Sequence, residues 1–184
     1  MPNNDYDRYN FSFRNTTNFL NNKFILDTSA NYIIQNDKNM VSQGQYFNPL
    51  TSLYLFPRGE DFSDVAVYER YDDLSGVNTQ YWPYGDLGGV SSQNPYWIMN
   101  RMNRENDRRR YKLAASLQYN IIEGLNVQGR VSIDNTESKY TEKFHAGTVG
   151  NFAGPKGRYK EENRLDRHCL LYTSPSPRDL STSR

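Results

Sequence analysis

The chain has 184 residues, of which 22 are Lys or Arg and 21 are Asp or Glu, so its formal net charge is +1. This near balance excludes a protein held on nucleic acid by a strong basic field. Hydrophobic residues make up 36% of the chain, and no run approaches the ~18 consecutive apolar residues of a membrane-spanning helix. Aromatic residues are nevertheless frequent, at 14%. This is atypical of a disordered chain and suits β structure in which every second residue is apolar.

The first two predicted strands are 9–19 and 24–35. Apolar residues occupy the odd positions of the first segment and the even positions of the second, a pattern typical of strands with one apolar face. This change of parity requires a connection with an even number of residues, and the Asn21-Asn22 pair supplies a two-residue type I′ turn. The resulting register places Arg14 diagonally across from Asp27.

A second predicted hairpin joins 111–121 to 125–133, and here the apolar residues stay at odd positions in both strands. The loop must therefore be odd in length, and Ile122-Glu123-Gly124 supplies three residues with Gly124 at the left-handed position. This register keeps apolar residues beside apolar ones, which a slip of one residue would destroy. It also places Lys112 opposite Asp134.

The segment between the hairpins is far longer than an ordinary connection. Its signals predict a short helix over 49–56 and a second helix that is capped by Asp61 or Ser63 and reaches about Tyr71. Tight turns at one end and a long loop at the other are typical of outer-membrane barrels. A strand from Tyr9 to Phe19 spans roughly 33 Å, enough when tilted to cross the ~25 Å apolar band of such barrels. The expected boundaries are a first barrel hairpin in 1–35, an extracellular loop in 36–108, a second hairpin in 109–145, and a further loop with the start of another strand in 146–168.

The expected fold class is therefore all-β: a partial transmembrane antiparallel β-barrel of two long hairpins, with a long extracellular loop carrying short helices. Periodicity alone leaves one alternative open, because antiparallel sheets of soluble proteins also have one apolar face. Asn15 and Thr28, which share the apolar face, fit that alternative. Four strands cannot close, since the smallest such barrels have about eight. We therefore expect the chain to be an internal segment of a larger barrel.

The last residues, 169–184, differ in character from the rest of the chain and contain its only cysteine, Cys169. The segment CLLYTSPSPRD (Cys169–Asp179) resembles the translation of a sequencing-library adapter. We therefore expect 169–184 to be an artefactual tail and the natural reading frame to be interrupted near His168.

Several blocks of the sequence, in order, resemble the SusC/RagA family of TonB-dependent outer-membrane transporters, and the likeness covers most of 1–168. The blocks are NPLTSLYLFPRGEDF (48–62), ERYD (69–72), TQYWPYGD (79–86), QNPYWIMNR (93–101), YKLAASLQYNIIEGLNVQGRVSIDN (111–135) and AGTVGNFAGPKG (146–157). The resemblance implies a 22-stranded barrel with a plug, located in the cell outer membrane, that imports glycans, oligosaccharides or peptides. It also implies two partners, a SusD-like lid lipoprotein and the TonB complex, in addition to outer-membrane lipid.

The candidate ligand-binding residues are aromatic side chains of the long loop, because aromatic faces with polar handles stack on sugar rings at wet sites. The same side chains can instead pack the loop against itself. The candidates are Tyr81, Trp82, Tyr84, Tyr96 and Trp97.

Polar residues of the strands are expected to face the barrel lumen, where they line the passage, contact the plug or are simply hydrated. These are Arg14, Asn31, Gln118, Gln128 and Arg130. Arg108, Arg109 and Arg110 lead into the third strand and are candidate contacts to lipopolysaccharide phosphates, since Arg binds phosphate bidentately. The alternative is a solvated rim in which these arginines pair with neighbouring acids.

No catalytic constellation, metal site or cofactor-binding motif is predicted. His145 and His168 are the only histidines and have no metal-type spacing. We expect the chain to be no enzyme, to require no cofactor and to bind no nucleic acid. Two rival functions remain: a soluble β-rich carbohydrate-binding module that uses the same aromatic residues, and an enzyme of glycan breakdown, for which no convincing carboxylate pair is present.

Overall fold

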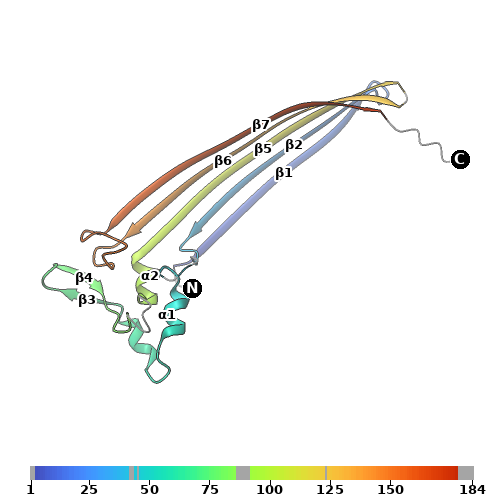
Figure 1. Cartoon of the computed structure of the whole chain (residues 1–184). Helices are drawn as coiled ribbons and strands as arrows, with labels where there is room; N and C mark the ends of the chain where they lie inside the picture. Colours follow the sequence, from blue (N-terminus) through green and yellow to red (C-terminus); the bar gives the residue numbers. More distant parts are fainter. Residues whose placement is uncertain (1–2, 42–43, 45, 86–91, 123, 178–184) are drawn as a thin grey trace. The chain divides into compact units, whose positions relative to one another are not determined.

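The computed structural model describes residues 3–41, 44, 46–85, 92–122 and 124–177. Five long strands form one sheet in the order β1-β2-β5-β6-β7, and two short strands form a separate hairpin (Figure 1). In the described residues β1 and β7 are the two edges of the long sheet, which is open and not a closed barrel. The long strands are β1 (Asp5–Phe19), β2 (Phe24–Lys38), β5 (Met102–Ile122), β6 (Leu125–Phe144) and β7 (Arg158–Pro177).

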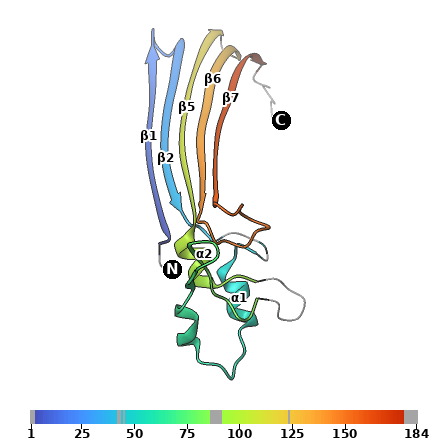
Figure 2. The ribbon, with the colours of Figure 1, turned by 90° about the vertical axis from the view of Figure 1, so that its left-hand side faces the viewer.

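The chain divides into two compact units, which are described separately here. The loop unit comprises Met1–Asp7, Asn36–Asp107 and Lys139–Glu162. The sheet unit comprises Arg8–Gln35, Arg108–Ser138 and Asn163–Arg184. Within the sheet unit, the β1–β2 turn and the β5–β6 turn lie at the same end of the sheet (Figure 2).

The first hairpin forms as predicted. Asn21 and Asn22 adopt positive φ angles of 55° and 65°, as a type I′ turn requires. Leu20 also lies in this left-handed region, with φ 51°, and its carbonyl accepts a 3.2 Å hydrogen bond from the backbone N–H of Lys23. The predicted diagonal contact between Arg14 and Asp27 is confirmed, with two hydrogen bonds of 3.2 and 2.7 Å.

The second hairpin also turns where the sequence predicts. Gly124 has a φ of 90°, a conformation that glycine adopts without steric cost, whereas Glu123 lies outside the described residues. The Asp134 carboxylate accepts two hydrogen bonds from Arg110, of 2.8 and 2.5 Å, a contact that the sequence did not predict when it placed Lys112 opposite Asp134. The guanidinium fork of Arg110 fits both carboxylate oxygens, which a lysine ammonium cannot do.

The two hairpins join through β2 and β5. The backbone N–H of Asn120 donates to the carbonyl of Lys23 at 2.8 Å, and the ring of Phe24 stacks on that of Tyr119 with centroids 4.5 Å apart. In each of these pairs the residue numbers have the same sum, so the strands run antiparallel in one register. The long loop therefore connects two strands that are neighbours in the sheet.

The strands of both hairpins are longer than their apolar alternation indicates. β5 begins nine residues before Tyr111, and β6 continues to Phe144. Polar side chains pair across these extensions: Asn106 donates to Asp37 at 2.9 Å, and Glu105 bridges two lysines of neighbouring strands. The strands therefore extend beyond the apolar alternation, because polar side-chain contacts join their outer ends.

The last strand continues beyond its expected end at His168 and runs to Pro177. Within this continuation Tyr172 lies beneath the Arg130 guanidinium, whose carbon is 5.6 Å from the ring centroid. Residues 169–177 therefore extend the sheet in this structure, although their sequence is identified as adapter-like. Residues 178–184 lie outside the described part of the chain.

In the described residues the loop unit contains three short helices. The expected first helix is α1 (Pro49–Leu55), with Asn48 as N-cap accepting from the backbone N–H of Leu50. The second expected helix is only a 3₁₀ turn, η1 (Phe62–Ala66), capped by Asp61. Its predicted extent to about Tyr71 is wrong, because Glu69–Asp72 form a strand. A third helix, α2 (Pro95–Arg101), has Asn94 as its N-cap. Its Asn-Pro start is the same signal as at Asn48. Among the helices of the described residues, none has the length and apolar character of a membrane span.

The core of the loop unit is small and aromatic. Trp97 and Met102 are each 1% exposed, and Ile98, Phe144 and Ala153 are 4% exposed. Phe47, Tyr68 and Phe152 pack against this cluster. The short hairpin of β3 (Glu69–Asp72) and β4 (Val77–Gln80) is antiparallel, with Glu69 paired to Gln80.

Candidate functional site

The sheet unit has one apolar face that is exposed. Along β5, Tyr111, Leu113, Leu117, Tyr119 and Ile121 share this face, and their exposed fractions lie between 37% and 46%. Neighbouring strands continue the face with side chains that are also exposed. A contiguous apolar surface of this kind marks an interaction site on most proteins. The neighbouring members are Tyr9, Phe11, Phe13, Tyr32, Val127, Val131 and Ile133.

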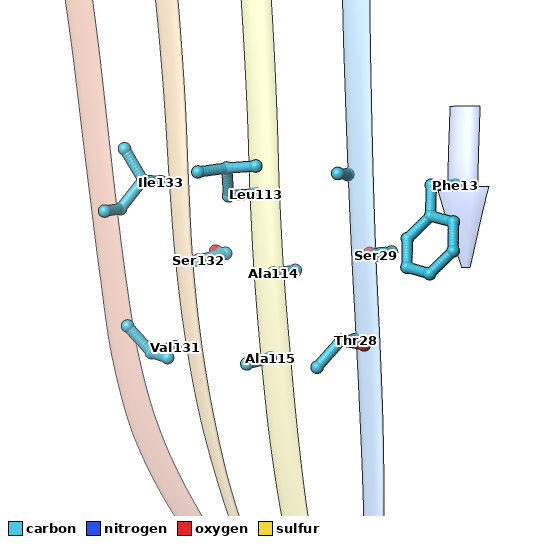
Figure 3. A pocket seen from close by; sticks show the side chains of 10 residues that line it. Phe13, Thr28, Ser29, Leu113, Ala114, Ala115, Val131, Ser132 and Ile133 are labelled. Atoms are coloured by element: carbon cyan, nitrogen blue, oxygen red, sulfur yellow. The ribbon is translucent and has the colours of Figure 1, made fainter. Parts of the chain in front are cut away.

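A shallow depression of about 320 Å³ crosses the middle of this apolar face (Figure 3). It forms where small residues on two strands, Ala30 and Ala115, leave room between larger neighbours. The larger side chains of Leu113, Val131 and Ile133 lie along its margins, so the face is uneven. In a packed protein core, side chains of a second layer would fill such a depression.

The opposite face of the sheet unit is polar, and its carboxylates are paired with arginines. Asp27 binds Arg14 at 2.7 Å, and Asp134 binds Arg110 at 2.5 Å. A broader depression of about 720 Å³ lies on this face. Of the residues predicted to face a lumen, Arg14, Asn31 and Arg130 line it. The amide of Gln118 donates to Asn120 at 2.9 Å, and strand alternation assigns both Gln118 and Gln128 to this polar face.

The arginine cluster predicted to contact lipopolysaccharide is divided by strand alternation. Arg108 and Arg110 belong to the polar face, where Arg110 is engaged by Asp134. Arg109 belongs to the apolar face, four residues before Leu113. The structure therefore does not present the three guanidinium groups on one surface, because successive residues of a strand point to opposite faces.

Three of the predicted ligand-binding aromatics line one pocket in the loop unit. Tyr81, Trp82 and Tyr84 surround a cavity of about 240 Å³, together with Asp64 and Arg70. The Arg70 guanidinium carbon lies 3.3 Å from the Tyr81 ring centroid, a cation–π geometry. The pocket thus combines aromatic faces, one carboxylate and one guanidinium, groups that can stack on a polar ring and hydrogen-bond its substituents.

Hydrogen bonds orient the side chains of this pocket, and desolvation changes the pKa of its Tyr84 hydroxyl. The Trp82 indole N–H donates to the Ser92 hydroxyl at 2.9 Å, and that hydroxyl donates to the Tyr84 carbonyl at 3.3 Å. Desolvation raises the pKa of the Tyr84 hydroxyl above its usual value, and the Glu60 and Asp64 carboxylates raise it further. The Tyr84 hydroxyl, which a tyrosine keeps protonated at neutral pH even at its usual pKa, can donate a hydrogen bond to a ligand.

The other two predicted aromatics do not line this pocket. Trp97 is 1% exposed, and its indole N–H donates to the Thr148 hydroxyl at 3.2 Å. Tyr96 stacks on Tyr68 with ring centroids 6.4 Å apart. The interpretation of Trp97 as a ligand contact does not fit its burial: α2 turns this side chain into the core of the loop unit.

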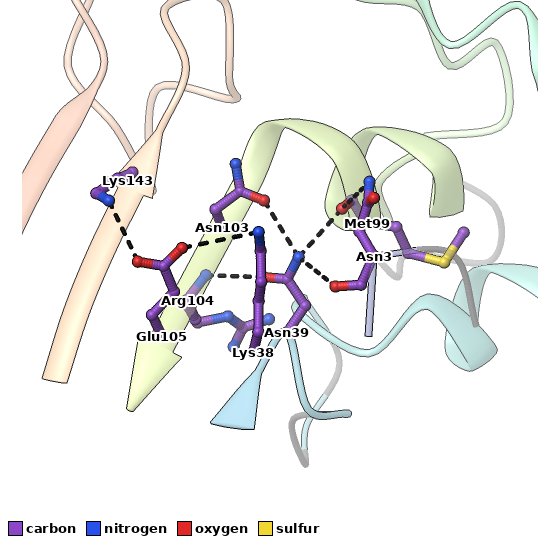
Figure 4. A network of polar contacts seen from close by, with 8 residues as sticks. All are labelled: Asn3, Lys38, Asn39, Met99, Asn103, Arg104, Glu105 and Lys143. Atoms are coloured by element: carbon purple, nitrogen blue, oxygen red, sulfur yellow. Dashed lines mark hydrogen bonds and ion pairs between the residues drawn. The ribbon is translucent and has the colours of Figure 1, made fainter. Parts of the chain in front are cut away.

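Asn39 fixes one end of the loop by four side-chain hydrogen bonds (Figure 4). Its amide donates to the carbonyls of Asn3 and Met99 and to Asn103 Oδ1, at 3.0 to 3.4 Å. Its oxygen accepts from the backbone N–H of Arg104 at 2.8 Å. Asn39 has a φ of 51°, which asparagine tolerates better than most residues. Nothing in the sequence pattern singles this residue out, because its partners are distant along the chain.

The β3–β4 hairpin beside the aromatic pocket is fixed by two contacts. Glu69 accepts two hydrogen bonds from Arg101, of 2.8 and 2.9 Å, which is the bidentate geometry of a strong pair. The backbone N–H of Gln80 donates to the carbonyl of Gly147 at 3.2 Å. The segment after β6 therefore supports the strand that leads into Tyr81.

We expect Gly147→Ala to destabilise the loop unit by about 2–4 kcal/mol, from the strain of a left-handed residue and from overpacking. Gly147 has a φ of +84°, and an added Cβ would lie 2.7 Å from Thr79 Cα and closer still to the Asn78 carbonyl oxygen. Urea unfolding followed by tryptophan fluorescence measures this, since Trp82 and Trp97 both belong to the loop unit. The control is Gly150→Ala, where nothing lies within 4 Å of the added Cβ. Equal losses for the two variants would contradict the expectation.

The described residues contain no group of three His, Cys, Asp or Glu side chains that could hold a metal ion. Neither a family model nor a curated protein matches the chain.

Proposed function

We propose that this chain is a segment of a TonB-dependent outer-membrane importer of the SusC/RagA type, to which it contributes barrel wall and an extracellular loop. The observation that carries the proposal is the exposed apolar face of the sheet unit, whose β5 members are 37–46% exposed. A lipid bilayer is the solvent in which such a surface is stable, and strands with one apolar and one polar face form the walls of membrane barrels. A soluble carbohydrate-binding module would instead need a second layer over this face.

The loop unit supports the same proposal. In the importer it faces outward, and its pocket of Tyr81, Trp82 and Tyr84 receives a sugar or peptide ligand before import. The polar face of the sheet unit belongs to the passage. A SusD-like lid lipoprotein covers the loops, and the TonB complex supplies energy through parts of the importer outside this segment. The role is transport, in the cell outer membrane, and not enzymatic catalysis.

The orientation of the loop tests this function. An epitope tag inserted after Leu74, which is 99% exposed in the turn between β3 and β4, should be labelled by antibody on intact cells that express the complete gene product. A tag inserted in the β1–β2 turn after Asn21 is the matched control and should be labelled only after the outer membrane is permeabilised. Labelling of both tags on intact cells, or of neither, would contradict the proposed placement.

Substitution of the pocket provides the second arm of the test. Trp82→Ala should weaken binding of the imported ligand by about tenfold or more, because stacked aromatic contacts at binding sites contribute on the order of 1–3 kcal/mol. Tyr54→Ala is the control, since Tyr54 is 88% exposed and does not line the pocket. Unchanged uptake in the Trp82 variant would remove the pocket from the proposed function and leave the membrane placement to the tag experiment.

A further inference from the structure

The polar face of the sheet unit carries an excess of positive charge. Its carboxylates in β2 and β6 are Asp27 and Asp134, and each is engaged by an arginine. Lys112 and Arg130 line the same 720 Å³ depression, and among the described residues neither forms a salt bridge. With both acids engaged by arginines, Lys112 and the Arg130 guanidinium, which lies over the Tyr172 ring, are the cations that a ligand can contact in this depression.

Several of the side chains that line this depression with the two cations are small and hydrophilic. They are hydroxyl and amide groups that donate and accept hydrogen bonds, and the depression they line is within the ~300–1,000 Å³ range of ligand sites. From β1, β2, β5 and β6 the polar lining is Ser12, Ser29, Asn31, Ser116 and Ser132, and β7 adds Leu170 and Tyr172. An aromatic ring beside hydroxyl and amide groups suits a sugar, whose ring stacks on aromatic faces and whose hydroxyls form hydrogen bonds.

We infer that this face binds acidic oligosaccharides, with ligand carboxylates or sulfates held by Lys112 and Arg130 and ring hydroxyls held by the serine and asparagine side chains. The inference rests on the proposed function and names the substrate class of the passage. Arg14 and Arg110 have a supporting role: each neutralises a carboxylate that would otherwise repel an anionic ligand.

Calorimetric titration of the complete gene product in detergent tests the inference with trigalacturonate and with maltotriose, a neutral ligand with the same number of rings. Trigalacturonate should bind more tightly, and its affinity should fall as salt is raised, because charge–charge attraction is screened. The double variant Lys112→Gln and Arg130→Gln should weaken trigalacturonate binding by about tenfold or more, since two charge-assisted hydrogen-bonding groups are lost. Arg109→Gln, at a neighbouring position on the opposite face, should leave the affinity unchanged.

Three results would overturn the inference: equal affinities for the two sugars, no effect of the double variant, or tighter binding of hexaglutamate than of trigalacturonate. The last would assign the face to an acidic protein segment. Circular dichroism of each variant checks that the sheet is retained. A gene product that inserts into lipid vesicles but shows no preference for trigalacturonate would overturn this inference alone. Failure to insert would instead contradict the proposed function.

Discussion

Leu117→Arg will destabilise the folded, lipid-inserted state by about 2–4 kcal/mol, the cost of an arginine near the middle of the lipid-facing side of a membrane strand. Leu117 is 46% exposed on the apolar face of β5, at an interior position between Tyr111 and Ile121. In a bilayer its surroundings would be hydrocarbon, where a guanidinium finds no water.

The matched control is Gln118→Arg, one residue further along the same strand. Gln118 belongs to the polar face, so an arginine there would meet water and polar neighbours, and the expected loss is below about 1 kcal/mol. Refolding of the complete gene product into lipid vesicles, followed through urea titration, gives both free energies. Similar losses for the two variants would show that the faces of β5 do not differ in their surroundings.

Trp97→Ala will destabilise the loop unit by about 3–5 kcal/mol, the usual cost of truncating a large buried aromatic. Trp97 is 1% exposed and packs with Ile98, Met102 and Phe144 in a core with few other members. The substitution removes apolar contacts and also the hydrogen bond to Thr148, whose hydroxyl still donates to the His145 carbonyl at 2.8 Å. The loss therefore reflects packing more than an unsatisfied polar group.

Trp82→Ala separates this structural role from ligand binding. Trp82 is only half-buried and lines the aromatic pocket, so its truncation should cost less stability than that of Trp97 while weakening ligand binding. Thermal unfolding followed by circular dichroism measures the first effect, and ligand titration the second. If Trp82→Ala proved the more destabilising of the two variants, the assignment of Trp97 to the core would be contradicted.

The hairpins could be predicted from the sequence because their determinants are local. Parity of apolar residues, the Asn21-Asn22 pair and Gly124 specify both turns, and the turns specify register. The Arg14–Asp27 contact followed from that register. The contact between Arg110 and Asp134 was not predicted, because the choice between two neighbouring cations depends on how a guanidinium fork meets a carboxylate, which register alone does not specify.

The loop unit could be predicted only in part, because its determinants are distant along the chain. Asn48 and Pro49 correctly indicated α1, but the burial of Trp97 depends on contacts with Phe144 and Thr148, which a local pattern does not reveal. The same applies to Asn39, whose partners include Met99 and Arg104. Aromatic composition indicated a binding surface, yet it did not distinguish the pocket residue Trp82 from the core residue Trp97.

The central claim, that odd-numbered residues of β5 face lipid and even-numbered ones face water, is tested most directly by spin labels placed singly along 111–121 in the complete gene product. Accessibility to oxygen and to a water-soluble nickel complex is measured in lipid vesicles. Oxygen accessibility should peak at positions 113, 115, 117 and 119, and nickel accessibility at 112, 114, 116 and 118. Uniform nickel accessibility at all positions, or protection of the odd positions from both reagents, would contradict the account.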